Sequence, residues 1–361
     1  MNHALTALIV FILTFAASLF FVSRAIRIAE HVGIMDIPGP RRVHTTAVPR
    51  FGGVAVFLAF AVGLAATFSL DVDRLQPEVP RLVVLLGGAA LITGVLVYDD
   101  VLGISPLPKL LWQIAAALLV VAPRLHGDNY GIVIDQFNAP FLGVVELPLV
   151  IALGFTIFWI VGMMNTLNFV DGLDGLASSV TIVGCAVLFI HTYFWPRGDP
   201  QFTISLLPLI LGAATLGFLW FNWHPARIIM GDAGANFLGF ALAVISIIGG
   251  AKIATALLAL GLPILDVAWV IIYRIAHGRS PGHADRGHLH HRLLDAGWSQ
   301  AHVVLFMAGV SAAFGAGALL LPDRTTKLIA LVAVGIVLLA TITIIALRDR
   351  QEAPARHTTE A

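Results

Sequence analysis

The chain has 361 residues, of which 58% are hydrophobic and only 12% are charged, and its formal net charge is zero. In a soluble domain roughly a quarter of the residues are charged. This composition therefore excludes an ordinary soluble enzyme and predicts an all-α polytopic membrane protein. The single cysteine, Cys185, lies inside an apolar run, which excludes a disulfide framework and predicts a buried thiol.

Eleven apolar runs approach the roughly 20 residues that a helix needs to cross a bilayer. They lie at 4–23, 52–70, 81–98, 107–123, 147–165, 176–194, 203–221, 233–250, 254–276, 303–321 and 327–347. The first run is interpreted as a retained span, because no basic stretch precedes it and no small-residue cleavage site follows it. An odd number of spans places the two termini on opposite sides of the membrane.

The orientation of these spans follows from their lysines and arginines. Fourteen of the 21 fall on one side and seven on the other, so the positive-inside rule predicts an outside N-terminus and a cytoplasmic C-terminus. Residues 129–146 combine β-branched residues with a turn at Asn138-Ala139-Pro140, which predicts a short external β-hairpin. We expect one transmembrane domain over residues 1–347 and a disordered cytoplasmic tail over 348–361.

Five polar clusters interrupt the apolar pattern, and in this topology all of them face the cytoplasm. They are 36–53, Asp99-Asp100, Asn165–Asp174, His224–Asn236 and Arg274–Trp298. Placing Asp beside hydrocarbon costs about 2.5–3.5 kcal/mol on the insertion scale, so the clusters need a reason to be there. Independent loops would not need to share one side, and the pattern therefore predicts a single composite site.

Two of the clusters are rich in acids. Asp99 and Asp100 close the third span, where they could attract a divalent cation, act as a base or merely solvate a helix end. The other acidic cluster repeats a polar residue every third position, at Asn165, Asn168, Asp171 and Asp174. Residues three apart are neighbours on a helix, and their oxygens are of the type that Mg²⁺ binds. A strict helix would nevertheless make the ends of this row diverge, and capping of the sixth span could explain one acid.

Two further clusters carry groups suited to phosphate. Asp232 lies at a predicted helix start, where backbone N–H groups would suit phosphate and the carboxylate could bind a metal or cap the helix. The last cluster holds the side chains of His283, Asp285, His288, His290, His291, Arg279, Arg286 and Arg292. A zinc site is an alternative, but no cysteine or zinc-type spacing supports it, and such donors suit a diphosphate better.

Asp266 lies inside the ninth span, just after Pro263. An ionisable residue in a span is a functional candidate. A kinked helix that brings it to the cytoplasmic rim is the simpler account, and the sequence leaves its role open.

Taken in order, the clusters resemble the polyprenyl-phosphate N-acetylhexosamine-1-phosphate transferase family, glycosyltransferase family 4. The matching segments are DIPGPRRVHTTAVPRFGG (36–53), YDD (98–100), NTLNFVDGLDGLA (165–177), GDAGANFLGF (231–240) and HADRGHLHHRL (283–293). The histidine segment resembles the branch that starts O-antigen, common-antigen or teichoic-acid linkage synthesis from UDP-GlcNAc. The peptidoglycan branch has three adjacent histidines, whereas Leu289 separates His288 from His290 here. Ala235 replaces a frequent serine, with little consequence expected.

This resemblance implies a reaction in which undecaprenyl phosphate attacks the sugar-linked phosphorus of UDP-GlcNAc, giving undecaprenyl-diphosphate-GlcNAc and UMP. It implies Mg²⁺ as cofactor, with Mn²⁺ as a substitute. The implied location is the bacterial inner membrane, with the active site toward the cytoplasm. The expected partners are the two substrates, the lipid bilayer and a second copy of the chain, but no nucleic acid.

The resemblance also implies roles for particular residues. Asn168 and Asp232 would hold the metal, while Asp99 or Asp100 would deprotonate or orient the lipid phosphate. Asp171 and Asp174 would organise the nucleotide and sugar pocket. The substrate-binding residues would be His44, Arg50, Asn165, His288, His290, His291 and Arg292.

Other readings of the sequence remain open at this stage. The same reaction could use another UDP-N-acetylhexosamine, such as UDP-linked FucNAc, QuiNAc, GalNAc or a diamino sugar. A transporter would place its binding groups near the midplane on repeated, broken helices, and neither feature is visible. An intramembrane aspartyl protease would need glycine at position 229, which is isoleucine.

Overall fold

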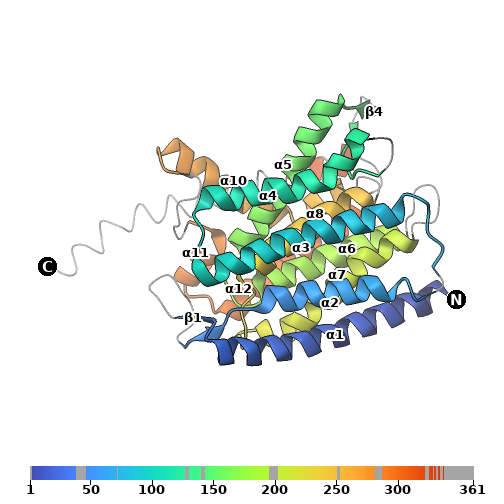
Figure 1. Cartoon of the computed structure of the whole chain (residues 1–361). Helices are drawn as coiled ribbons and strands as arrows, with labels where there is room; N and C mark the ends of the chain where they lie inside the picture. Colours follow the sequence, from blue (N-terminus) through green and yellow to red (C-terminus); the bar gives the residue numbers. More distant parts are fainter. Residues whose placement is uncertain are drawn as a thin grey trace.

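The computed structural model describes residues 2–37, 46–70, 72–126, 130–139, 143–194, 202–249, 253–280 and 287–321, with short stretches between 325 and 336. Most of these residues are helical, and the longer helices form one bundle (Figure 1). The helices are α1 (His3–Val32), α2 (Gly52–Ala66), α3 (Glu78–Leu102), α4 (Pro106–Val121), α5 (Leu149–Val170), α6 (Leu176–Phe194), α7 (Phe202–Asn222), α8 (Gly231–Ile248), α9 (Ile253–Ala259), α10 (Gly261–Ala276), α11 (Leu289–Asp295) and α12 (Gln300–Leu320).

The helices support the prediction of a multi-pass membrane protein. Within the described ranges, eight helices are long and apolar enough to cross a bilayer, and the bent pair α9–α10 could provide a ninth crossing. The second predicted span corresponds to α2, which has 15 residues and is shorter than expected. The eleventh, at 327–347, lies largely outside the described residues, as does the tail after residue 347.

The run predicted as a single span at 254–276 consists of two helices, α9 and α10. The chain bends by 78° between α9 and α10, with Leu260 at the break. Pro263 explains the position of this bend. In a continuous helix its ring would clash with the carbonyl of Ala259, which is the last residue of α9.

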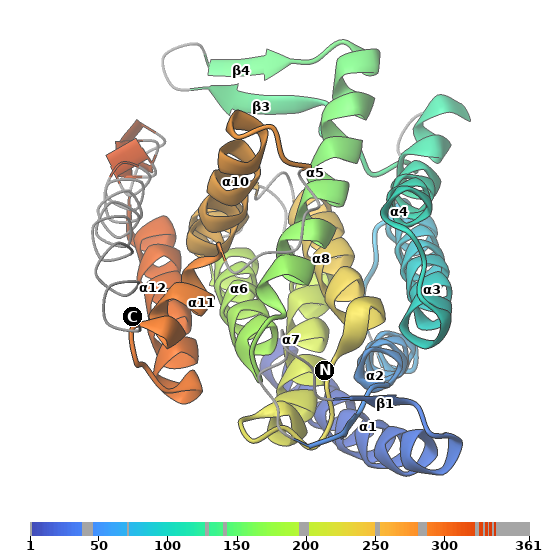
Figure 2. The ribbon, with the colours of Figure 1, turned by 90° about the vertical axis from the view of Figure 1, so that its left-hand side faces the viewer.

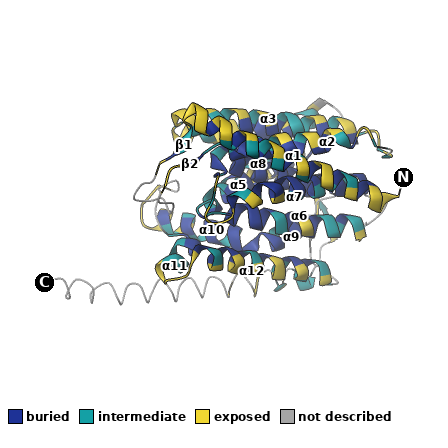
Figure 3. Ribbon diagram, turned by 90° about the horizontal axis from the view of Figure 1, so that it is seen from below, coloured by how far each residue is buried: buried dark blue, intermediate teal, exposed yellow. Residues whose placement is uncertain are grey.

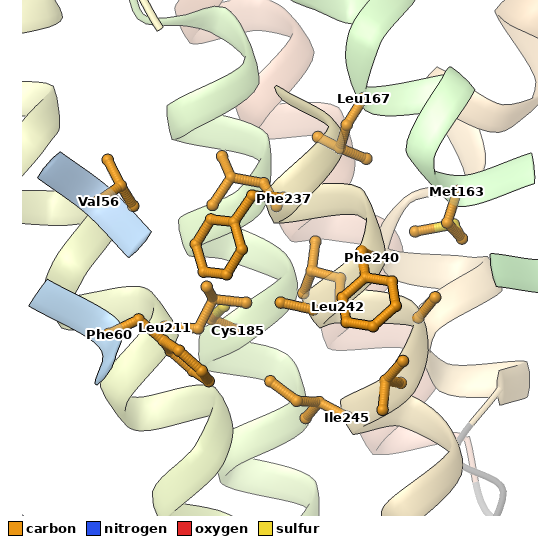
Figure 4. Close-up of a cluster of buried hydrophobic side chains, with 14 of the residues drawn as sticks. Val56, Phe60, Met163, Leu167, Cys185, Leu211, Phe237, Phe240, Leu242 and Ile245 are labelled. Carbon is orange, nitrogen blue, oxygen red and sulfur yellow. The ribbon is translucent and has the colours of Figure 1, made fainter. Parts of the chain in front are cut away.

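Helix α8 is the centre of the bundle, and every one of its residues is buried except Asp232. Figure 2 shows α8 enclosed between α5, α7 and α2, and Figure 3 shows buried residues gathered on the inner helices and exposed ones on the outer helices. Figure 4 shows the α8 side chains Phe237, Phe240, Leu242 and Ile245 packed among residues of neighbouring helices. The thiol of Cys185 belongs to this core, which confirms the prediction of a buried cysteine.

Close approach between helices depends on glycine, because packing rather than hydrophobic transfer drives helix association in lipid. A Cβ atom at Gly239 of α8 would overlap the carbonyl oxygen of Met163 on α5. A Cβ atom at Gly53 of α2 would overlap the backbone nitrogen of Gly234 on α8. The backbones of three helices therefore meet where no larger residue fits.

Two small antiparallel sheets lie at opposite ends of the bundle (Figure 1). At one end β1 (Met35–Asp36) pairs with β2 (Val48–Pro49), and the next residue, Arg50, bridges in parallel to Ile229. At the other end β3 (Gln136–Ala139) pairs with β4 (Gly143–Glu146), while the tip of the predicted turn lies outside the described residues. The first sheet brings the segment before α2 next to the segment before α8.

Substituting Gly239 by alanine is expected to destabilise the bundle. The added methyl group would overlap the α5 backbone, and overpacking of this kind typically costs about 1–3 kcal/mol. Gly162→Ala is the matched control, because a Cβ atom at Gly162 would have no heavy atom within 4 Å. Thermal unfolding in detergent should show a lower midpoint for Gly239→Ala alone, and equal midpoints for the two variants would contradict the packing described here.

Candidate active site

Three carboxylates from two helices converge at the end of the bundle that carries β1. Asp99 and Asp100 end α3, and Asp232 lies in the first turn of α8. One carboxylate oxygen from each residue lies within 4.8 Å of the others. Two of the predicted clusters therefore meet in one acidic site, although about 130 residues separate them in the sequence.

Two cationic side chains neutralise part of this charge. The ammonium of Lys109 lies 2.6 Å from Asp99 Oδ2 and 2.7 Å from Asp232 Oδ2. The guanidinium of Arg50 lies 2.9 Å from Asp100 Oδ1, 3.4 Å from Asp232 Oδ1 and 3.7 Å from Asp36 Oδ1. Burial alone would lower the pKa of Arg50, but these carboxylates raise it, so Arg50 stays charged.

Asp100 also fixes the start of α8. Its Oδ1 accepts the backbone N–H of Asp232 at 2.9 Å, and its Oδ2 accepts that of Ala233 at 3.2 Å. Gly231 makes this approach feasible, since its φ is 73° and a Cβ atom there would lie 2.6 Å from Asp100 Oδ2. Two of the backbone N–H groups that would suit phosphate therefore already bind the Asp100 carboxylate.

Asp99 is held differently and keeps one oxygen directed to the cations. Its Oδ1 accepts the backbone N–H of Ile104 at 2.5 Å, in the turn that follows α3. Its Oδ2 is the atom that Lys109 contacts. The two adjacent acids therefore make different contacts. Asp100 anchors the start of α8, whereas Asp99 directs one oxygen to Lys109.

Lys109 and Gln113 were not among the predicted site residues. The Gln113 side chain donates to Asn236 Oδ1 at 2.7 Å and accepts from Asn165 Nδ2 at 2.8 Å, and Asn236 Nδ2 donates to the carbonyl of Asp232. A buried polar chain thus joins α5, α4 and α8. The available signal was their spacing, because Lys109 and Gln113 lie four apart on one face of an otherwise apolar run.

The four polar residues around the end of α5 do not all point to one place. Asn165 binds Gln113 on α4, whereas Asp174 Oδ2 lies 2.7 Å from His224 Nδ1 and accepts the backbone N–H of Ala226. Asn168 is half-buried on the last turn of α5, and Asp171 follows as the C-terminal cap. The row diverges because α5 ends at Val170, and Asp174, in the turn beyond it, fixes the loop between α7 and α8.

Asp171 lies within electrostatic range of the acidic site. Withdrawal of its carboxylate from water, together with the charges of Asp232 and Asp100, raises the pKa of Asp171 well above its ordinary value. Part of the residue stays accessible. Additional positive charge nearby would lower the pKa of Asp171 again.

The histidine segment packs against the same end of α5. His288 stacks on Phe169 with ring centroids 5.4 Å apart and on His290 at 5.6 Å, and the rings of His290 and His291 lie 4.3 Å apart. His290 is buried against Gly172, where a Cβ atom would overlap its Nε2. Arg292 donates from Nε to the carbonyl of Gly287 at 3.0 Å. The predicted residues His44, His283 and Asp285 lie outside the described ranges.

The chemistry of this donor set fits a hard divalent cation. Asp99, Asp100 and Asp232 offer carboxylate oxygens at short mutual distance, and Asp171 lies near them. Among the described side chains, Lys109 and Arg50 form ion pairs with the three acids, so one negative charge remains uncompensated before Asp171 and Asp36 are counted. Oxygen ligands with excess negative charge suit Mg²⁺ or Mn²⁺ and not a soft metal.

The fold and this site define an integral membrane enzyme that handles charged groups at one end of its helices. The chain belongs to glycosyl transferase family 4, whose family model matches residues 82–250. It is 32% identical, over 88% of its length and 85% of the relative, to the probable undecaprenyl-phosphate N-acetylglucosaminyl 1-phosphate transferase of Bacillus subtilis. It is a sugar-phosphate transferase, and family and branch agree with the resemblance in the sequence.

Two other relatives show the breadth of this similarity. The chain is 31% identical to the decaprenyl-phosphate N-acetylglucosaminephosphotransferase of Mycobacterium tuberculosis strain H37Rv, over 91% of this chain and 87% of the relative. It is 30% identical to the phospho-N-acetylmuramoyl-pentapeptide-transferase of Borrelia turicatae, over 75% of this chain and 81% of the relative. The N-acetylglucosaminyl enzymes match a longer part of the chain than the muramoyl enzyme does.

Substituting Asp100 by asparagine is expected to lower the free energy of unfolding by about 3 kcal/mol, because it breaks a buried ion pair and disturbs the start of α8. Asp135→Asn is the matched control. Its partner Arg124 lies at 3.4 Å in an exposed pair at the other end of the bundle, for which a loss below about 1 kcal/mol is expected. Similar chemical denaturation curves for the two variants would show that Asp100 does not anchor α8.

Substituting Asp171 by asparagine is expected to change how stability depends on pH. The raised pKa means that folded protein binds this proton more tightly than the unfolded chain, so wild-type stability falls as pH rises above the unfolded value. The asparagine side chain does not titrate, so the variant should be the more stable one at neutral pH, with the difference vanishing below about pH 4. Thermal unfolding with a chelator present measures this, and parallel pH profiles would contradict it.

Proposed function

We propose that this protein transfers N-acetylglucosamine 1-phosphate from UDP-GlcNAc to undecaprenyl phosphate and releases UMP. A phosphate oxygen of the lipid attacks the sugar-linked phosphorus, and the bond from that phosphorus to the bridging oxygen of UMP breaks. The names of the B. subtilis and M. tuberculosis relatives, which specify a polyprenyl phosphate and N-acetylglucosamine, support this assignment. Within family 4, such a reaction would start a cell-surface polysaccharide.

One observation carries the proposal: three carboxylates and two cations from separate helices and loops meet at a bundle end. Both substrates carry phosphate, and one of them is a lipid that stays in the bilayer. Their reaction therefore needs groups that neutralise phosphate charge at the membrane surface, where the helices end. Phosphoryl transfer depends mainly on positioning and charge neutralisation, with little covalent chemistry from the protein.

Mg²⁺ would be held by Asp99 and Asp232, whose Oδ2 atoms already face a cation, with Asn168 as the amide ligand that the family resemblance implies. When bound, Mg²⁺ supplies positive charge that neutralises the diphosphate and favours departure of UMP. Asp100 is less suited to this role, because both of its oxygens accept backbone N–H groups.

The protein's own residues would bind and orient the two substrates. Lys109 and Arg50 can exchange part of their contact with the carboxylates for contact with phosphate oxygens. Of the two adjacent acids we assign Asp99 to orient the lipid phosphate, because Asp100 is committed to α8. Asp171 would bind the nucleotide-sugar, and His288, His290, His291 and Arg292 would contact its diphosphate or sugar. Asp174 would act through the loop before α8.

This function requires the acidic site to face the compartment that contains UDP-sugars. The excess of lysine and arginine on the site's side supports a cytoplasmic orientation in the bacterial inner membrane. The first sheet, the end of α3, the end of α5 and the start of α8 lie together at this end (Figure 2). The donor would enter from the cytoplasm, and the lipid would arrive within the inner leaflet.

Purified protein with undecaprenyl phosphate, Mg²⁺ and UDP-GlcNAc should release UMP and form a lipid-linked sugar diphosphate. Asp232→Asn should reduce the rate at least roughly 100-fold, because it removes a carboxylate ligand of the Mg²⁺ that would neutralise the reacting diphosphate. Asp135→Asn at the other end should retain the wild-type rate. Turnover with a different UDP-N-acetylhexosamine alone would correct the donor, and no UMP release with any donor would refute the proposal.

A further inference from the structure

Asp266 is a buried acid that the proposed mechanism does not use. It lies on α10, its residue is 2% exposed, and the sequence alone gave it no role. Its Oδ2 lies 2.9 Å from Nδ1 of His288, and its Oδ1 accepts the backbone N–H of Leu289 at 2.8 Å. Both oxygens of one carboxylate therefore hold the start of α11, where the histidine segment begins.

This arrangement determines which nitrogen of His288 carries a proton. A carboxylate oxygen only accepts, so Nδ1 must donate, in the neutral ring as well as in the imidazolium. Nε2 is then the nitrogen left for another group. It is buried, and among the described residues it has no hydrogen-bond partner. A buried ring nitrogen without a partner suggests a contact that a ligand or a movement of the site supplies.

The surroundings of the His288 ring place it beside the catalytic end of α5. One face stacks on Phe169, which directly follows Asn168, and the ring also stacks on His290. His290 in turn lies against Gly172, the residue after Asp171. The side chain of Asp266 thus directly contacts His288, the first of the histidines that the proposed function assigns to the donor substrate.

We propose that Asp266 is a positioning residue of this transferase, which fixes the proton of His288 on Nδ1 and presents Nε2 to the diphosphate-sugar donor. The proposal rests on the proposed function for the identity of the ligand. It requires no contact between Asp266 and substrate. The carboxylate acts through His288 and through the backbone of Leu289, in the manner of a carboxylate that orients a functional histidine.

Asp266→Asn tests this with nearly unchanged shape. The N–H of Leu289 can only donate, so the amide oxygen of the introduced asparagine is retained there and its NH₂ group faces His288. Nδ1 must then accept, and the proton moves to Nε2. We expect kcat for UMP release to fall roughly 10- to 100-fold, the range found for loss of a carboxylate that orients a metal-binding histidine.

His288→Asn serves as the reference background. Its amide can still donate to Asp266, but it has no counterpart of Nε2. If Asp266 acts through His288, adding Asp266→Asn to His288→Asn should change kcat by less than about twofold. If the two losses multiply, or if Asp266→Asn alone retains the wild-type rate while His288→Asn does not, the proposal is wrong.

Glu78→Gln is the matched control for loss of a buried carboxylate. Glu78 is also buried, but it lies far from Asp266 in the sequence. Its carboxylate accepts a hydrogen bond from the hydroxyl of Thr203 at 2.8 Å. Both variants should unfold at similar temperatures, and only Asp266→Asn should lose activity. If both variants lost activity equally, in proportion to their loss of thermal stability, Asp266 would have a structural role and the proposal would be overturned.

A spectroscopic measurement separates this proposal from the proposed function. In ¹⁵N-histidine-labelled wild-type protein, the His288 signals, identified by their absence in His288→Asn, should show a proton on Nδ1. In Asp266→Asn the proton should be on Nε2. This holds even if no UDP-sugar is turned over, in which case only the proposed function fails. A wild-type ring with bare Nδ1 would overturn the positioning role, including when Asp266→Asn does not fold.

Discussion

The structure depends above all on the contact between the Asp100 carboxylate and the first turn of α8. This carboxylate accepts two backbone N–H groups of α8 and pairs with Arg50, so it connects α3, α8 and the segment after β2. Helix α8 is otherwise buried along its whole length and must be enclosed in a fixed position by its neighbours. Because unpaired charge is so unfavourable beside hydrocarbon, this polar junction forms where several helices can contribute to it at once.

The same constraint explains why the site is composite. Each acid is paired with a cation or backbone donor from a different element. Lys109 of α4 forms ion pairs with Asp99 and Asp232, and Arg50 forms one with Asp100. The buried amides of Gln113, Asn165 and Asn236 extend the polar junction inward without adding charge. Glycines allow the backbones to approach closely enough for these short side chains to meet. Polar satisfaction and close packing are thus parts of one arrangement.

Much of the site could be predicted from the sequence, because acids and histidines between long apolar runs are conspicuous. Asp99, Asp100 and Asp232 were expected to lie close together, and their carboxylates do. Lys109 and Gln113 were missed, since a single lysine near a helix start usually indicates orientation in the membrane and not a site. The direction of Asp174 depends on the loop it binds, and the bend before Gly261 depends on where Pro263 falls in the helix. Counting apolar runs in the sequence predicts neither the direction of Asp174 nor the size of this bend.

The position of Lys109 has a consequence for how the enzyme would handle metal ions. Its ammonium already sits between two acids, as a counter-ion tethered to the chain. A divalent ion arriving there must compete with a partner whose local concentration is fixed by the fold and never falls. A divalent ion held there would therefore bind less tightly than it would to the same acids without the lysine. At rest the lysine keeps the acids from repelling one another.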